Sequence, residues 1–179
     1  VGNAGNGNVK EGNSTSDRGG RIVSLGQSGS VGKAGSVNVT TTGKLLVLNK
    51  GKISSDTFAT GNGGPVAVNA NNIIIDGSGS YISSQSAMQS TGNGGDVALS
   101  ATGNITLLNG GEIDSATYSR GSAGVVKVTA GGNLSVLSNG FISSSTSAAG
   151  NAGTVDVKAG NATISGGGNI VSQAMPGST

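Results

Sequence analysis

Residues 92–99 read Gly-Asn-Gly-Gly-Asp-Val-Ala-Leu, and this phrase of spaced glycines followed by alternating aliphatic residues decides the fold. The phrase recurs in related form at 32–39, 61–68, 121–128 and 150–157, so its first valine returns every 29 to 31 residues. Repeats of this length stack as a solenoid, because one unit cannot bury its apolar side chains alone. The sequence predicts five to six stacked coils, a coil being one full turn of the solenoid.

Each repeat contains three short segments in which aliphatic and polar residues alternate. Such alternation is typical of a strand buried on one face, and no apolar stripe of helical period persists along the chain. Glycine-bearing turns separate the segments, at positions where the backbone needs positive φ. Strands of successive coils are expected to pair in parallel about 4.8 Å apart. The predicted fold is an all-β parallel β-helix with three short strands per coil.

Residues one repeat apart should lie above one another, in columns that we call ladders. Two ladders are aliphatic, and a third consists of serines two residues beyond each isoleucine, on the same inward face. A buried hydroxyl needs a hydrogen-bond partner, so these serines are predicted to bond along their column or to the neighbouring corner backbone. The predicted ladders are Val37, Val66, Val97, Val126 and Val155; Ile53, Ile82, Ile113, Ile142 and Ile170; and Ser55, Ser84, Ser115, Ser144 and Ser172.

The first thirty residues fit this repeat poorly. Gly7 stands where the first valine belongs, and Ser14 and Ser16 stand where the second segment has its aliphatic pair. We expect 1–30 to be a capping coil or a diverged internal coil, and the chain to be a fragment of a longer solenoid. The five regular coils are predicted at 31–60, 61–91, 92–120, 121–149 and 150–179.

Composition excludes several kinds of chemistry. The chain has no cysteine, histidine or tryptophan, so it lacks thiolate ligands and the commonest general base and metal ligand. Glu112 and Asp114 flank Ile113 and are expected to point outward together as a solvated surface pair. A catalytic or calcium-binding role is the alternative interpretation of this pair. Five equivalent serines do not indicate one nucleophile. We expect no enzyme activity and no catalytic, metal or cofactor site.

Charge is unevenly distributed along the chain. Residues 1–52 hold seven Lys or Arg against two Asp or Glu, a net +5, whereas the remainder holds three against six, a net −3. In a solenoid this order becomes a positive and a negative end, which suits head-to-tail stacking into an open filament. Nucleic-acid binding is not expected, because no aromatic stacking platform accompanies the basic residues. No apolar run approaches the roughly 20 residues that span a bilayer, so membrane insertion is not expected either.

Some apolar residues are predicted on the outer surface. Leu46 and Ile74 should lie on the outer side of the second strand in adjacent coils, and Tyr81 and Phe141 on the outer side of the third. Exposed apolar groups often mark contacts. We therefore expect lateral packing of rods, or packing against a flanking segment, at these four residues.

Three phrases, 92–99, 103–115 and 150–157, resemble the repeats of filamentous-haemagglutinin-like exoproteins, which Gram-negative bacteria, cyanobacteria included, export by two-partner secretion. The resemblance covers 31–179 and, more faintly, 1–30. It implies a secreted or surface-held fibre that acts in adhesion, aggregation or extracellular matrix, with host or matrix glycans or proteins as partners. The absence of cysteine fits a chain that crosses the outer membrane unfolded.

Some of these exoproteins are glycosylated at Asn-x-Ser/Thr. Here Asn104, Asn133 and Asn161 begin such tripeptides and share one column before the second strand. Modification is one interpretation, and turn asparagines that simply precede strand residues are the other.

A structural or adhesive extracellular fibre is the function that the sequence favours. A glycan-binding or glycan-degrading β-helix is the first alternative, and it would need carboxylates and basic residues clustered on neighbouring coils. An ice-binding β-helix is the second, and it would need a regular outward array of threonines, which the mixed outer columns do not provide.

Overall fold

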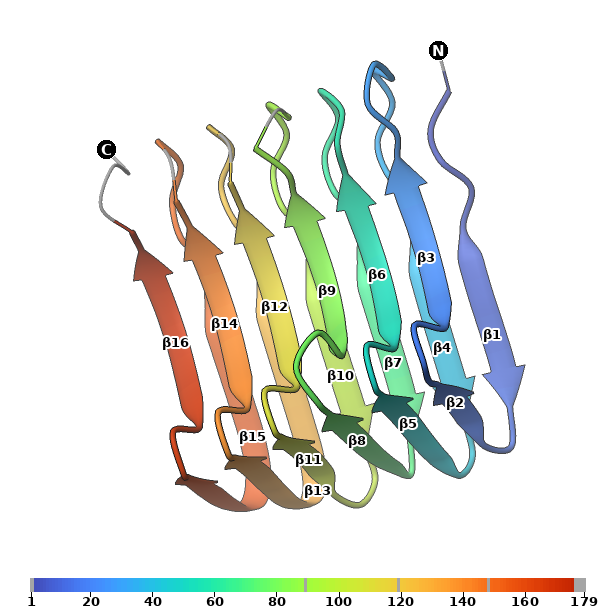
Figure 1. Cartoon of the computed structure of the whole chain (residues 1–179), viewed down its shortest axis with the longest axis vertical. Helices are drawn as coiled ribbons and strands as arrows, with labels where there is room; N and C mark the ends of the chain where they lie inside the picture. Colours follow the sequence, from blue (N-terminus) through green and yellow to red (C-terminus); the bar gives the residue numbers. More distant parts are fainter. Residues whose placement is uncertain (1, 89, 119, 148, 176–179) are drawn as a thin grey trace.

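The computed structural model describes residues 2–88, 90–118, 120–147 and 149–175. These residues form sixteen strands and no helix, and the chain winds through six coils from one end of a row to the other (Figure 1). The predicted fold class, an all-β parallel solenoid, is confirmed.

The strands divide among the six coils in chain order. The first three coils contain β1 (Gly7–Glu11), β2 (Ser14–Ser16) and β3 (Arg21–Gly26); β4 (Val37–Thr41), β5 (Lys44–Leu48) and β6 (Lys52–Thr57); and β7 (Val66–Ala70), β8 (Asn72–Asp76) and β9 (Tyr81–Ser86). The last three contain β10 (Val97–Ala101), β11 (Ile105–Leu108) and β12 (Glu112–Thr117); β13 (Val126–Leu137) and β14 (Phe141–Thr146); and β15 (Val155–Ser165) and β16 (Asn169–Ala174).

Equivalent strands of successive coils pair in parallel and form two sheets. The third strands form a six-stranded sheet in the order β16-β14-β12-β9-β6-β3, and the first and second strands form a ten-stranded sheet that bends around the remaining side. The register is the one that the repeat predicts: Val97 pairs with Val66 on one side and with Val126 on the other. Side chains one repeat apart therefore lie in continuous columns.

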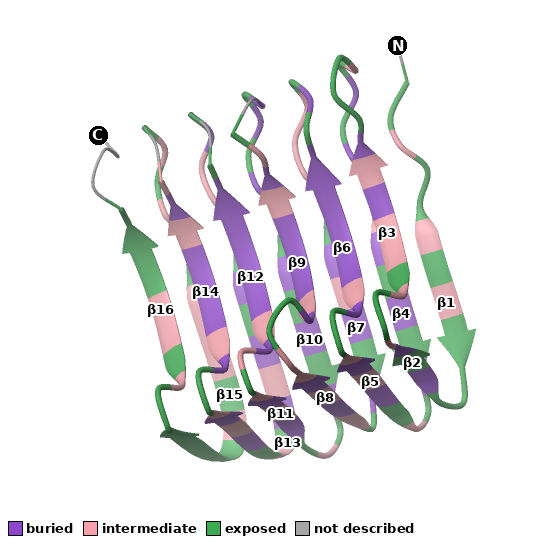
Figure 2. Ribbon diagram, in the orientation of Figure 1, coloured by how far each residue is buried: buried purple, intermediate pink, exposed green. Residues whose placement is uncertain are grey.

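The core lies between the sheets and consists of inward-facing Val, Ile and Leu. Figure 2 shows buried residues concentrated in the middle coils, whereas β1 and β16 at the two ends are intermediate or exposed. The N-terminal coil has fewer apolar side chains to contribute, because Gly7 is paired with Val37, and Ser14 and Ser16 are paired with Leu45 and Val47.

The last two coils depart from the expected three strands. In β13 and β15 the first and second strands are continuous, because backbone pairing carries on around the bend through Ala130 with Ala159 and Asn133 with Asn161. A register shift between Ala130 and Asn133 takes up the extra residue of the bend.

Glycines recur because backbones of neighbouring coils approach closely at one corner. A Cβ added to Gly92 would overlap the carbonyl oxygen of Gly61, and one added to Gly95 would overlap that of Gly64. The same overlap recurs in every regular coil, so no larger residue fits either column. The two glycine columns are Gly32, Gly61, Gly92, Gly121 and Gly150, and Gly35, Gly64, Gly95, Gly124 and Gly153.

Polar side chains beside these glycines connect one coil to the next. The backbone N–H of Asn93 donates to Oδ1 of Asn62 at 3.0 Å, and the N–H of Ser122 donates to Oδ1 of Asn93 at 2.9 Å. Each side chain thus satisfies a backbone donor of the following coil at a bend where the strand ladder is interrupted.

Replacing Gly92 with alanine is expected to destabilise the protein by about 1–3 kcal/mol, because the new methyl group would force the corner backbones apart. Thermal unfolding followed by circular dichroism measures this change. The matched control is Gly12→Ala, since a Cβ at Gly12 meets no atom within 4 Å. This control should be neutral or slightly stabilising, and an equal loss in both variants would contradict the close-approach explanation.

Candidate functional site

The serine ladder ties the six-stranded sheet to the glycine corner. Ser55 Oγ donates to the carbonyl oxygen of Gly35 at 2.6 Å and accepts from the N–H of Gly64 at 3.0 Å. This uses the hydroxyl as both donor and acceptor, which is a structural role. The corresponding bonds to corner carbonyls are made by Ser84, Ser115, Ser144 and Ser172.

The asparagine column before the second strand is exposed and hydrogen-bonded along the axis. Oδ1 of Asn104 accepts from the backbone N–H of Asn133 at 2.8 Å, and Oδ1 of Asn133 accepts from Nδ2 of Asn161 at 3.1 Å. These side chains therefore stabilise the stacking of the coils at this bend.

The four outward apolar residues form two separate groups. Leu46 and Ile74 are paired neighbours on β5 and β8 and are half-buried. Tyr81 and Phe141 share a column on the six-stranded sheet, but Glu112 lies between them. Apolar surface at these positions is thus broken into short patches.

The acidic residues of the six-stranded sheet are more deeply buried than the sequence predicts. Asp114 faces outward, yet it is only 1% exposed, so the prediction that Glu112 and Asp114 form a solvated pair is wrong for Asp114. The equivalent residues of the neighbouring coils, Ser54, Ser83 and Ser143, are buried too, so the position in the coil and not the residue type sets this burial. Asp56, two coils away, is also buried.

Gln85 connects these two aspartates, although they lie in different columns. Its backbone N–H donates to Oδ1 of Asp56 at 3.0 Å, and its Nε2 donates to Oδ2 of Asp114 at 2.9 Å. Ser54 Oγ donates to the other oxygen of Asp56 at 2.7 Å. Oδ1 of Asp114 is buried and has no hydrogen-bond partner. We call Asp56, Glu112 and Asp114 the acidic cluster.

Burial raises the pKa of all three carboxyl groups in the acidic cluster. The pKa of Asp114 rises well above its usual range, first because burial removes its solvation and then because Glu112 and Asp56 repel its negative charge. Burial and the same carboxylates raise the pKa of Tyr118 to about 12, so that its hydroxyl stays protonated at neutral pH. When the carboxyl groups of the acidic cluster ionise, no ion pair in the described part of the chain compensates their charge.

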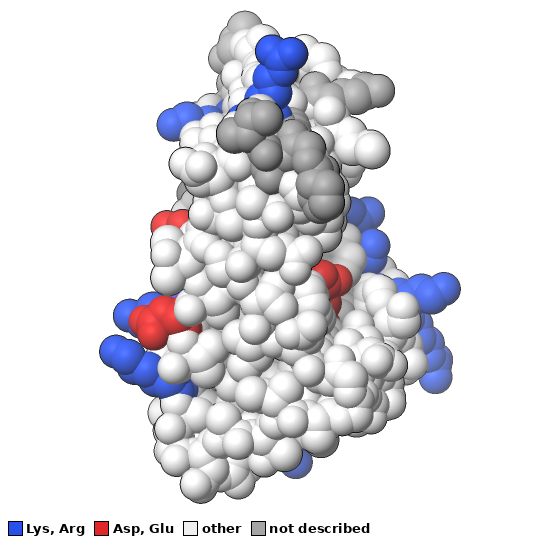
Figure 3. Space-filling model, turned by 90° about the vertical axis from the view of Figure 1, so that its left-hand side faces the viewer, with Lys and Arg blue, Asp and Glu red and all other residues white. Residues whose placement is uncertain are grey.

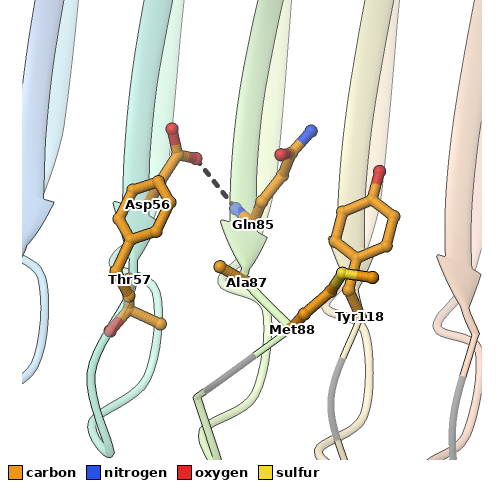
Figure 4. Close-up of a pocket in the computed structure, with 7 residues that line it drawn as sticks. Asp56, Thr57, Gln85, Ala87, Met88 and Tyr118 are labelled. Carbon is orange, nitrogen blue, oxygen red and sulfur yellow. Dashed lines mark hydrogen bonds between the residues drawn. The ribbon is translucent and has the colours of Figure 1, made fainter. Parts of the chain in front are cut away.

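A pocket opens beside the acidic cluster at the end of the six-stranded sheet. Phe58 and Tyr118 follow equivalent strand ends two coils apart, and the small Ala87 occupies the coil between them, which leaves a gap between the two rings. Figure 4 shows the polar ends of Asp56, Gln85 and Tyr118 pointing the same way, with Met88 beside Tyr118. This aromatic slot has a volume of about 330 Å³ and is lined by Asp56, Thr57, Phe58, Gln85, Ala87, Met88 and Tyr118.

Sequence reasoning missed this site, although three signals could have indicated it. Asp114 stands in an outward column that holds serine at Ser54, Ser83 and Ser143. Ala87 interrupts a column that holds Phe58 and Tyr118. The corner of the third coil, Ser86 to Gly92, is also two residues longer than Thr57 to Gly61, and it carries Met88.

Metal-ligand groups and membrane-spanning helices were looked for in the described part of the chain. Among the described residues, no group of three or more Asp, Glu, His or Cys is arranged to hold a metal ion. The same part of the chain also contains no helix of the length and apolarity that crossing a membrane would require.

The fold and the site define the chain as a parallel β-solenoid with a buried acidic cluster and an aromatic slot on one face. Comparison of the chain with protein-family models, with curated proteins and with solved structures found no match.

Changing Asp114 to asparagine is expected to stabilise the protein at neutral and alkaline pH by about 1–3 kcal/mol, because it removes a buried charge with an unsatisfied oxygen. The folded chain keeps a proton on Asp114 that the unfolded chain releases near the usual aspartate pKa of 3.8. Stability should therefore fall as the pH rises from that value through the raised pKa. The variant should lose less stability than the wild type over this range.

Thermal unfolding midpoints measured between about pH 4 and pH 8 test this expectation. The difference between Asp114→Asn and wild type should vanish at the acid end and grow with pH. Asp96→Asn removes the same charge from an exposed position and should show no such growth. A difference that is constant with pH would contradict the burial argument.

Proposed function

We propose that this chain is a rod segment of an extracellular fibre with a structural or adhesive role. The observation that carries the proposal is that every coil pairs in register with the next, so that the ladders run through six coils and end in strands with one unpaired edge. Such edges are templates for further pairing. The rod can therefore be extended by another coil of the same geometry.

The C-terminal end face is apolar where a further coil would dock. Ile164 pairs with the core residue Val136 on one side and is 50% exposed. Val155, Val157 and Ile170 also pack against the core, but they are only partly buried. Figure 3 views this end and shows a largely uncharged surface, with charged side chains around its edge.

We propose that a further coil of the same geometry covers this face, and that the first coil of a second copy, stacked head to tail, can supply it. Strands β1, β2 and β3 present the complementary unpaired edge at the opposite end of the rod. The expected negative end is not found, because residues 121–179 hold Lys127 and Lys158 against Asp156. The contact would therefore rest on apolar residues and backbone pairing and not on opposite charges. A contact between two different ends does not close on itself, so it generates an open filament.

An adhesive role, secretion to the cell surface and recognition of matrix glycans or proteins are supported by the resemblance of the repeats to filamentous-haemagglutinin-like exoproteins. A rigid shaft with corners that vary from coil to coil suits such a role, because corners can carry binding groups while the ladders hold the shape. We do not extend the proposal to ice binding, since the outer columns are mixed: Asn38, Ala67, Ala98, Lys127 and Asp156 form one of them.

Replacing Ile164 with aspartate is expected to suppress end-to-end association, because a charge would be buried at the apolar contact. Sedimentation velocity over a concentration series, with electron microscopy of the same samples, measures rod length. The control is Val125→Asp, which places the same charge at an exposed valine on the side of the rod. Circular dichroism checks that both variants keep the native strand content.

The wild type and Val125→Asp should form longer rods as concentration rises, and Ile164→Asp should remain short. A wild type that stays a single rod at every concentration would overturn head-to-tail stacking. Equal association of all three proteins would show that the C-terminal face is not the contact.

A further inference from the structure

We propose that the aromatic slot binds an organic cation, namely a primary ammonium or guanidinium group on an aliphatic stem. The site is formed by the two rings of Phe58 and Tyr118, the thioether of Met88 and the acidic cluster beside them. This inference is independent of the rod's assembly.

Among the described residues, the acidic cluster has no cation beside it. None of the three carboxylates of the acidic cluster has an ion-pair partner in the described part of the chain, where Asp17 pairs with Arg18. Arg21 on β3 acts on Asp56 only at a distance, and the ammonium of Lys52 on β6 lies over the ring of Tyr81, 4.6 Å from its centroid. Strand β14, on the far side of β12, contributes no charged side chain. A cationic ligand would supply the missing charge.

Asp114 has an oxygen atom without a hydrogen-bond partner among the described residues. This residue is 1% exposed, its Oδ2 accepts from the amide of Gln85, and its Oδ1 has no partner. Gln85 lines the slot and Asp114 does not, so the carboxylate of Asp114 is connected to the pocket through the Gln85 amide. A buried carboxylate without a full set of donors is costly, and a cation held in the slot would offset its charge, while the donors of that cation face Asp56, the member of the acidic cluster that lines the slot.

The slot also has the shape and the chemistry that an organic cation requires. Phe58 and Tyr118 arise from strands two coils apart, so their backbones are roughly 10 Å apart, and the Ala87 methyl group leaves the space between them open. Both rings and Met88 are exposed to an incoming ligand. Aromatic faces attract cations within about 6 Å of the ring centroid, and the thioether is an adaptable apolar contact for an aliphatic stem.

A metal ion does not fit the same groups. Calcium needs six to eight oxygens at about 2.3–2.6 Å, whereas Asp56 and Asp114 lie on strands two coils apart with Gln85 between them. An organic cation is larger, and it can contact an aromatic face and a carboxylate at the same time.

The two methionines of the chain allow a direct test, because Met88 lines the slot and Met175 lies in the last coil. The protein is labelled with ¹³C at the methionine methyl groups and titrated with pentylamine at about pH 8, where alkylamines remain protonated. We expect a saturable shift of the Met88 signal and none of the Met175 signal. Pentan-1-ol, which has the same stem without the charge, should bind at least tenfold more weakly.

Two variants and one control assign the contacts. Asp114→Asn and Phe58→Leu should each weaken pentylamine binding at least tenfold, and Asp96→Asn should leave it unchanged. Thermal unfolding of each variant shows that the fold is retained. A Met88 signal that no amine shifts, equal binding of pentan-1-ol, or wild-type affinity in Asp114→Asn would each overturn the proposal, as would a preference for Ca²⁺ over pentylamine.

Spermidine and a capped lysine-containing peptide then identify the source of the cation. Tighter binding of spermidine would support a free polyamine, and tighter binding of the peptide would support a lysine side chain of a protein partner. If neither binds although pentylamine does, the slot does not accept a cation of either source and the proposal fails.

Discussion

Backbone pairing between coils about 4.8 Å apart is the constraint on which the whole structure depends. It requires that nothing larger than a hydrogen atom project where the corners meet, and the two glycine columns meet that requirement. At this backbone distance, paired residues such as Val97 and Val126 stack directly on one another. The narrow aliphatic core, the serine bonds to the corners and the exposed asparagine column all follow from this one distance.

The sequence predicted the fold well because ladders demand the same kind of residue at the same place in every coil. Column positions such as Ile113 could be assigned by counting, and even the imperfect pairing of Gly7 with Val37 could be anticipated. The continuous strands β13 and β15 could not, since pairing through a bend depends on the path of the backbone and not on residue type.

The candidate site was harder to predict because it consists of exceptions to the columns. Asp114 occupies a serine column, and counting places it outward, but its burial depends on the side chains that surround it on both sides. Gln85 connects Asp56 with Asp114 through one backbone and one side-chain bond. Such a link joins different columns, and no periodicity in one chain reports it. The paired strands and the aliphatic core continue on either side of Asp114 and stabilise the fold around it.

The longer corner between Ser86 and Gly92 has a consequence for how this kind of molecule changes. Its two additional residues lie outside the paired strands, and the register of β9 with β12 is the same as elsewhere in the sheet. Loop length and loop chemistry can therefore vary in one coil without altering its neighbours. A lineage or a designer could exchange such corners one at a time, and the shaft would then serve as a scaffold that displays different recognition loops at fixed intervals.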